Sequence, residues 1–257
     1  MSPRRLAELT SPAVAALPPH GIAVLPVGAV EQHGPHLPLL TDLLVAETLA
    51  ADAVAAHGDE HELWLLPPLA CTKSNEHAWA AGTLWLGAAT LMAVVHDLGR
   101  SVANTPLRKL VFLNGHGGNS ALLNVCAREL RLDFGLATFV MHPSLPPDQG
   151  GVSPAEELGT GIHGGKDETS LVLHLRPDLV RMDLATRNVP QRLAGFEHVR
   201  FGGPVSFGWS SDDFGTDGTL GDPTLATAGH GAALYAGMLR QAGEAFAEIA
   251  RFAHGRP

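Results

Sequence analysis

Two short groups of polar side chains in this chain have the types and spacing that metal centres use. Glu31, His33 and Asp42 follow one apolar segment of strand length, and His116 follows another. Divalent metal ions take carboxylate oxygens and imidazole nitrogens as ligands, and open α/β sheets bind ligands at the carboxyl ends of their strands. In an extended segment, Glu31 and His33 point the same way because alternate residues share a face. These residues predict a metal site that two loops build together.

A third segment, from Gly161 to Ser170, adds His163 and Glu168 to the candidates. His163 lies in a glycine-rich loop, and Glu168 opens a predicted helix. Because the N-terminal turn of a helix stabilises an acidic side chain by itself, Glu168 taken alone is also explained as a helix-terminal acid. His163 taken alone is also explained as a loop residue outside any pocket.

The loop from Gly115 to Asn119 has a second interpretation, as a cradle for a phosphate group at a helix N-terminus. It lacks the Lys-Ser/Thr pair of a Walker motif and the full G-x-G-x-x-G spacing. A non-catalytic protein that binds a metal or a phosphate ligand is therefore the weaker alternative. A dinuclear phosphoesterase is also disfavoured, since the motif loops hold only Lys73 and Lys166 as clamps for a phosphoryl group.

Apolar runs of strand length alternate along the chain with helical patterns. Thr41 or Asp42 is expected to cap the first long helix, Asn119 a later one, and Gly229 to interrupt the last. The alternation predicts an α/β fold, a three-layer α/β/α domain with a mostly parallel sheet. The expected strands are residues 21–27, 63–66, 109–113 and 136–141, and the expected helices are 42–57, 88–102, 120–130, 168–175 and 225–253.

Two long stretches, 143–165 and 202–223, break this alternation and are rich in glycine. In a compact domain, loops of this length usually cover a functional site or make subunit contacts. Neither a repeat nor a linker divides the sequence. Residues 1–257 are therefore expected to form a single domain.

The composition excludes several classes of partner. A formal net charge of −9 over 257 residues argues against nucleic acid or an anionic membrane, because phosphate binding needs a basic face. Cys71 and Cys126 lie outside any CxxC spacing, which excludes a disulfide scaffold and a structural zinc finger. No segment approaches the run of about 18 apolar residues that a membrane span needs. A cytoplasmic enzyme is expected.

Four motifs in register resemble the creatininase family of metal-dependent amidohydrolases: VGAVEQHGPHLPLLTD, SNEHAWAAGT, FLNGHGGN and HGGKDETS. The resemblance implies a creatininase-like fold, a dinuclear site holding zinc, manganese or iron, with zinc favoured, and a homohexamer. Carried over to this chain, Glu31, Asp42 and His116 would hold one metal ion. His33 and Asp42 would hold the other, so that Asp42 bridges the two.

One position departs from the family pattern. In creatininase a glutamate two residues after the NGH histidine completes the second site, and this chain has Gly118 there. Glu168 is the candidate replacement. Glu31, Asp42 and Glu168 together carry three negative charges, which two divalent ions and one bridging hydroxide would balance in a buried site.

The resemblance also implies the reaction, hydrolysis of a C–N bond by hydroxide that bridges the two metals. His163 would pass a proton to the leaving nitrogen, with Glu168 as the second catalytic candidate. Expected substrate contacts are Ser74, Glu76, His77 and Gly117. Creatininase has aromatic side chains at the places of Gly117 and, approximately, Gly159, so the pocket here is expected to be wider.

The expected substrate is a small cyclic amide, a formamide or a peptide. An alternative within the same family is the peptidase that trims the mycofactocin precursor peptide. The HGGN form of the His116 loop is closer to that peptidase, and to the formylaminopyrimidine deformylase of the same family, than to creatininase proper.

Overall fold

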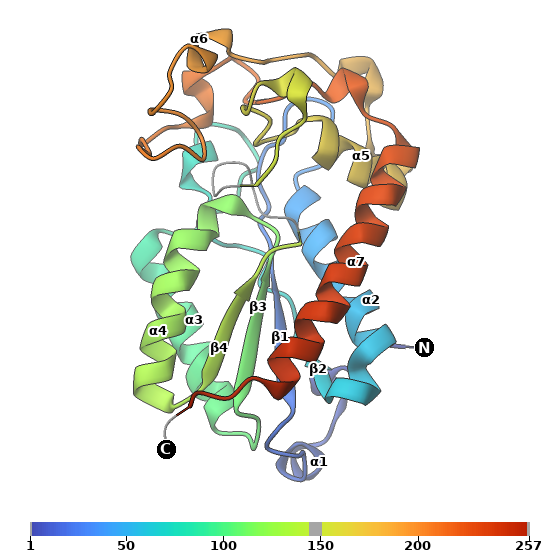
Figure 1. The fold of residues 1–257 in the computed structure, drawn as a ribbon, viewed down its shortest axis with the longest axis vertical. Helices are drawn as coiled ribbons and strands as arrows, with labels where there is room; N and C mark the ends of the chain where they lie inside the picture. Colours follow the sequence, from blue (N-terminus) through green and yellow to red (C-terminus); the bar gives the residue numbers. More distant parts are fainter. Residues whose placement is uncertain (1, 144–150, 256–257) are drawn as a thin grey trace.

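The computed structural model describes residues 2–143 and 151–255 and is built around one parallel sheet (Figure 1). The strand order is β2-β1-β3-β4 and every pairing is parallel. The strands are β1 (Ile22–Val27), β2 (Leu63–Leu65), β3 (Lys109–Asn114) and β4 (Ala137–Met141). All four predicted strands are therefore present, each shifted by no more than a residue at either end.

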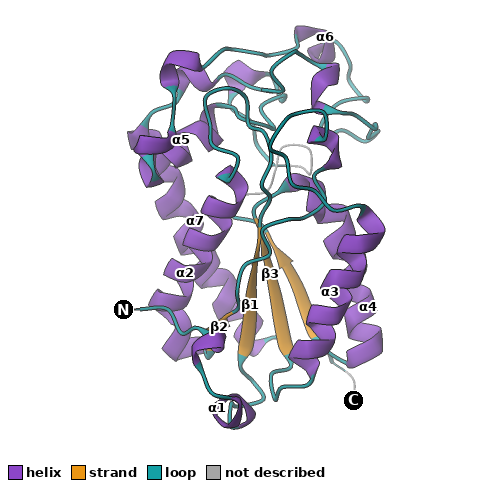
Figure 2. Ribbon diagram, turned by 180° about the vertical axis from the view of Figure 1, so that it is seen from behind, coloured by secondary structure: helices purple, strands orange, loops and turns teal. Residues whose placement is uncertain are grey.

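Helices cover both faces of the sheet, as Figures 1 and 2 show from opposite sides. On one face lie α2 (Thr41–His61), α5 (Lys166–Leu175) and α7 (Ala228–Arg251), and on the other α3 (Ala88–Ala103) and α4 (Ser120–Phe134). The predicted three-layer α/β/α fold is confirmed. The remaining helices are short: α1 (Ser11–Ala15), α6 (Gln191–Ala194), and the 3-10 turns Leu6–Glu8, Asn75–His77, Gly117–Asn119, Ala155–Glu157, Pro177–Leu179, Met182–Leu184, Ser211–Asp213 and Pro223–Leu225.

Alternation along the buried strands gives the molecule two cores. In β1, Ile22 and Val24 pack toward α2 and α7, whereas Ala23 and Leu25 pack toward α3 and α4. A strand that is covered on both faces is apolar throughout instead of alternating with polar residues. This explains why β1 and β3 read as continuous apolar runs.

Two helix ends differ from the prediction. Neither Thr41 nor Asp42 caps α2, because the helix begins at Thr41 and Leu40 holds the cap position without a side-chain bond. Thr41 Oγ1 instead donates to the carbonyl of Pro38 at 2.8 Å. The carboxylate of Asp42 lies within ion-pair distance of two imidazoles, which draw it away from the cap position.

The last helix also starts differently. It runs without interruption from Ala228, past Gly229, because Thr227 caps it and accepts from the amide of His230 at 3.1 Å. Asn119 holds the cap position before α4, but its side chain makes no cap bond. Its amide donates to Thr72 Oγ1 at 3.1 Å, so this side chain fastens a neighbouring loop.

The long connections gather at one end of the molecule, above the carboxyl ends of the strands (Figure 1). They include the described part of 143–165, of which residues 144–150 lie outside the described residues, and the stretch 202–223. The predicted loops thus lie where open α/β sheets bind ligands.

Glycine allows α2 to approach the end of β1. A Cβ on Gly28 would collide with the Cα of Leu43 and lie 2.7 Å from its backbone nitrogen. The first turn of α2, which carries Asp42, therefore packs directly on the backbone that follows β1.

We expect Gly28→Ala to lower the free energy of unfolding by about 1–3 kcal/mol, because the methyl group forces α2 away from β1. Urea denaturation followed by circular dichroism measures this. Gly87→Ala is the matched control, since a Cβ there meets no atom within 4 Å, and it should stay within roughly 0.5 kcal/mol of the unmodified chain. Equal stability of the two variants would contradict the close packing.

Candidate metal centre

The candidate ligands come from three separate segments that meet above β1 and β3. Glu31 and His33 follow β1, Asp42 lies in the first turn of α2, and His116 follows β3. The amide of Glu31 donates to the carbonyl of Leu39 at 2.9 Å, which folds the loop back toward α2. All four candidate side chains are buried.

Two groups of three possible ligands share one carboxylate. Glu31, Asp42 and His116 form the first group, in which ligand atoms lie within 4.8 Å of one another. His116 Nδ1 lies 3.0 Å from Asp42 Oδ2, and His116 Nε2 lies 3.4 Å from Glu31 Oε2. These are the three residues assigned to one metal ion from the sequence.

The second group is His33, Asp42 and Glu168. His33 Nε2 lies 3.1 Å from the other oxygen of Asp42, Oδ1. Glu168, in the first turn of α5, accepts from the amide of Gly164 at 2.6 Å. Asp42 thus belongs to both groups, and Glu168 offers a ligand atom within 4.8 Å of those of His33 and Asp42.

A side chain at position 118 would displace neighbouring side chains of this site. A Cβ on Gly118 would collide with Glu76 Oε1 and lie 2.5 Å from His116 Nε2. Glu76 holds its place through Lys73, whose Nζ donates to Glu76 Oε2 at 2.6 Å. The departure from the family pattern at Gly118 is therefore accompanied by a carboxylate from another segment beside His116.

The distribution of protons in the site indicates a shortage of positive charge. Burial raises the pKa of Glu31 to about 8, against the charge of His116, and burial also raises the pKa of Glu168 to about 7. Burial would lower the pKa of His33, but Asp42 outweighs it and raises this pKa to about 10. Acidic side chains that lie this close together keep protons in order to limit their repulsion. Such a site suits divalent cations, because a cation displaces those protons when it binds.

One buried oxygen also indicates that the site is suited to a cation. Glu31 Oε1 accepts no hydrogen bond from any residue in the described ranges. A buried polar atom without a partner costs free energy, and a cation held by Glu31 would remove that cost. The residues therefore fit a dinuclear metal site. The same acidic surroundings disfavour a phosphate group at the loop from Gly115 to Asn119.

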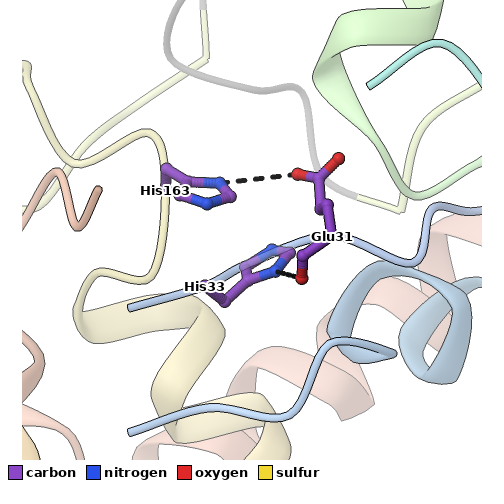
Figure 3. Close-up of side chains that lie close together, drawn as sticks. All are labelled: Glu31, His33 and His163. Atoms are coloured by element: carbon purple, nitrogen blue, oxygen red, sulfur yellow. Dashed lines mark hydrogen bonds and ion pairs between the residues drawn. The ribbon is translucent and has the colours of Figure 1, made fainter. Parts of the chain in front are cut away.

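His163 presents an unprotonated nitrogen to the site. Its Nε2 lies 2.6 Å from the carbonyl of Gln32, and because a carbonyl only accepts, Nε2 carries the proton. Its Nδ1 then faces Glu31 Oε1 at 3.7 Å (Figure 3). Burial, followed by His77 and His33, holds the pKa of His163 well below its usual value. His163 also forms a third possible ligand group with Glu31 and His33.

Gln32 was missed by the sequence analysis, because alternation points it away from Glu31 and His33. Its Oε1 accepts from the amide of Gly34 at 2.8 Å, so its NH₂ group donates to His77 Nδ1 at 2.8 Å. The other nitrogen of His77 then carries the proton and lies 3.3 Å from Glu31 Oε1. Ser211 Oγ also lies 2.9 Å from His77 Nδ1, which connects the 202–223 loop to the site.

Glu157 is a second residue that no sequence motif signalled. This buried carboxylate accepts from the amide of Lys166 at 2.8 Å and from that of Asp222 at 2.7 Å. A Cβ on Gly161, or on Gly165, would collide with it. Gly161 and Gly165, which flank His163, therefore leave room for the carboxylate of Glu157. Through its bond to the amide of Lys166, Glu157 connects the His163 loop to α5.

A cavity of about 880 Å³ opens beside these residues. Of the expected substrate contacts, Glu76, His77 and Gly117 line it, whereas Ser74 lies outside its lining. Ser74 is fully buried and donates to Glu31 Oε2, so it orients a candidate ligand instead. The described lining also includes Asp42, His116, His163, Glu168, Lys73, Lys166, Phe207, Trp209, Val45, Leu171, Leu234 and Met238.

No helix in the described ranges is both long enough and apolar enough to cross a bilayer.

Comparisons with known proteins agree with this geometry. The family model described as creatininase, creatinine amidohydrolase, matches residues 7–246. A mycofactocin precursor peptide peptidase of Mycobacterium ulcerans (strain Agy99) is 36% identical, over 97% of this chain and 93% of that protein.

Solved structures are similar along nearly the whole chain. A mutant creatininase of Zn-Zn type is 25% identical with a TM-score of 0.73, over 96% of this chain and 98% of that one. A structure named "Creatininase Mn" is also 25% identical with a TM-score of 0.73, over 97% of this chain and 100% of that one. With a family model matching most of its residues and its four motifs around one buried centre, this chain belongs to the creatininase family.

Proposed function

We propose that this chain is a metal-dependent peptidase that hydrolyses a peptide bond in a substrate related to the mycofactocin precursor peptide. Its family hydrolyses C–N bonds. The observation that carries the proposal is the pair of buried ligand groups that share Asp42 beside the large cavity. The peptidase relative, which is similar over 97% of this chain, favours a peptide over the small cyclic amides and formamides.

The size of the cavity supports a peptide substrate. A volume of about 880 Å³ is in the upper part of the range for sites that enclose drug-sized ligands, roughly 300–1,000 Å³. A small cyclic amide fills only part of such a space. Gly117, at the position where creatininase has an aromatic side chain, lies in the lining and leaves it open.

We assign one ion to Glu31, Asp42 and His116, and the other to His33, Asp42 and Glu168. When bound, divalent ions supply Lewis-acid polarisation of the amide carbonyl and a water molecule acidic enough to be the nucleophile. Zinc and manganese are the first candidates, because solved family structures carry those names. A cytoplasmic location and a homohexamer stay predictions from the sequence.

The side chains around the assigned ligands have the remaining roles in catalysis. His163 Nδ1, unprotonated and facing Glu31, accepts the proton of the attacking water and returns it to the leaving nitrogen. Ser74 donates to Glu31 Oε2 and so helps to fix the orientation of that carboxylate, while His77 Nε2 faces Oε1 at 3.3 Å. Phe207 and Trp209, from the 202–223 loop, form one wall of the cavity and exclude water from the reacting bond.

Substrate choice is tested by incubating the metal-loaded protein with the mycofactocin precursor peptide and, separately, with creatinine. We expect two peptide fragments whose masses sum to that of the precursor plus one water, detected by mass spectrometry. Turnover of creatinine should be at least about tenfold less efficient, since a misfitting substrate loses about 1.4 kcal/mol or more of transition-state binding. More efficient turnover of creatinine than of the peptide would contradict the proposal.

Metal content tests the shared carboxylate. We expect about two metal ions per chain in the unmodified protein and loss of most of both in Asp42→Ala, because Asp42 belongs to both ligand groups. Elemental analysis after loading with manganese measures this. Asp97→Ala, which removes an exposed acid of α3, should retain both ions. Full metal content in Asp42→Ala would rule out the bridging role.

The role of His163 is tested by His163→Gln. We expect turnover of the peptide to fall by about 10²–10⁴-fold, because the proton acceptor is lost, while metal content stays unchanged. His20→Gln, at the opposite end of the sheet, is the control and should keep full turnover. A loss of metal in His163→Gln would make His163 a ligand, as its grouping with Glu31 and His33 allows.

A further inference from the structure

A second cluster of metal-binding side chains lies far from the cavity, at the other end of α2. His57, Glu60 and His61 each offer one ligand atom, and these atoms lie within 4.8 Å of one another. None of the three lines the cavity. Helical rise places His57 about 22 Å along α2 from Asp42, so the two clusters cannot share an ion.

The two imidazoles are held together before any ion arrives. Residues four apart on a helix lie one above the other on the same face, and the rings of His57 and His61 stack with centroids 6.2 Å apart and planes 13° from parallel. On the α7 side, a Cβ on Gly243 would lie 2.5 Å from His57 Nε2. The absence of a side chain at Gly243 gives the ring of His57 its place.

The rings are also free to act as ligands. In the described ranges no hydrogen bond involves the ring of His57 or of His61, and the nearest charged group to His61 Nε2 is Glu60 Oε1 at 3.9 Å. The side chain of His61 is 13% exposed and that of Glu60 is 73% exposed. An ion can therefore reach the cluster from solvent, with Glu60 closing over it.

We propose that His57, Glu60 and His61 form an additional metal site, distinct from the dinuclear centre and selective for zinc, nickel or copper ions. Two imidazoles and one carboxylate suit these borderline ions, whereas manganese and magnesium prefer sites rich in oxygen. Three protein ligands leave a position for water. Because the cluster spans the last turn of α2, which ends at His61, a bound ion fastens that turn and stabilises the folded state.

The test uses Asp42→Ala together with His33→Gln (the Asp42→Ala background), so that no candidate group of the dinuclear centre, the group of Glu31, His33 and His163 included, keeps three ligands and obscures the additional site. Isothermal titration with nickel should show one ion per chain, and titration with manganese should show none. Adding His61→Gln should weaken nickel binding at least tenfold, and adding Glu60→Ala should weaken it by a smaller factor. His96→Gln, which removes an exposed histidine of α3, should leave nickel binding unchanged.

A thermal melt gives a second readout that does not depend on activity. Nickel should raise the melting temperature of the Asp42→Ala background and fail to raise it once His61→Gln is added. Glu60 is exposed, so Glu60→Ala leaves the fold intact and keeps the test valid if a histidine variant unfolds. Nickel binding of unchanged strength in both His61→Gln and Glu60→Ala would overturn the proposal, as would no binding in the Asp42→Ala background.

Discussion

The carboxylates Glu31, Asp42 and Glu168, of which the first two are buried, lie at one end of a parallel sheet and are the constraint on which the rest of this structure depends. Burial raises the pKa of Glu31 and of Glu168, and the neighbouring carboxylates raise the pKa of His33 and of His116. This arrangement costs free energy, because charged and unpaired groups are removed from water. Neutral polar side chains surround Glu31 and Asp42 because their contacts offset part of this cost.

The scaffold meets this constraint with close backbone packing. Gly28 and Gly115 let the first turn of α2 approach the ends of β1 and β3, and a Cβ at Gly115 would lie 2.7 Å from the carbonyl oxygen of Asp42. On the opposite side, Glu157 fills the space left by the glycines around His163. Close packing thus positions the segments that carry the candidate ligands, which suits a site that must hold ions at fixed distances.

Substrate specificity is determined by a different part of the molecule. The candidate ligands come from the ends of β1 and β3 and from the first turns of α2 and α5, but the cavity is shaped by loops above the sheet and by apolar residues such as Leu234 and Met238 of α7. Fold and reaction class can therefore persist while the substrate changes between a small ring and a peptide. The His57 cluster lies outside both parts, in the last turn of α2.

The fold and the candidate ligands were readable from the sequence because both depend on local pattern. Continuous apolar runs predict strands covered on both faces, and Glu31, His33, Asp42 and His116 stand directly after such runs or at the start of the next helix. Gln32, Glu157 and Ser211 were not readable, since each acts through contacts with residues far away in the chain. The cap expected at Thr41 or Asp42 failed for the same reason: the pairing of Asp42 with His33 and His116 outweighs its helix-capping tendency.

The amino-acid sequence by itself determined the order of the strands and helices, the chemical types of the ligands and the family. Tertiary structure alone decided that Gln32 donates to His77, that Ser74 supports Glu31 from outside the cavity, and that Glu76 occupies the space beside Gly118. The physical reason is the separation along the chain of the residues that interact. Hydrophobic periodicity acts between neighbours along the chain, whereas shared charge and close packing act between segments that only folding brings together.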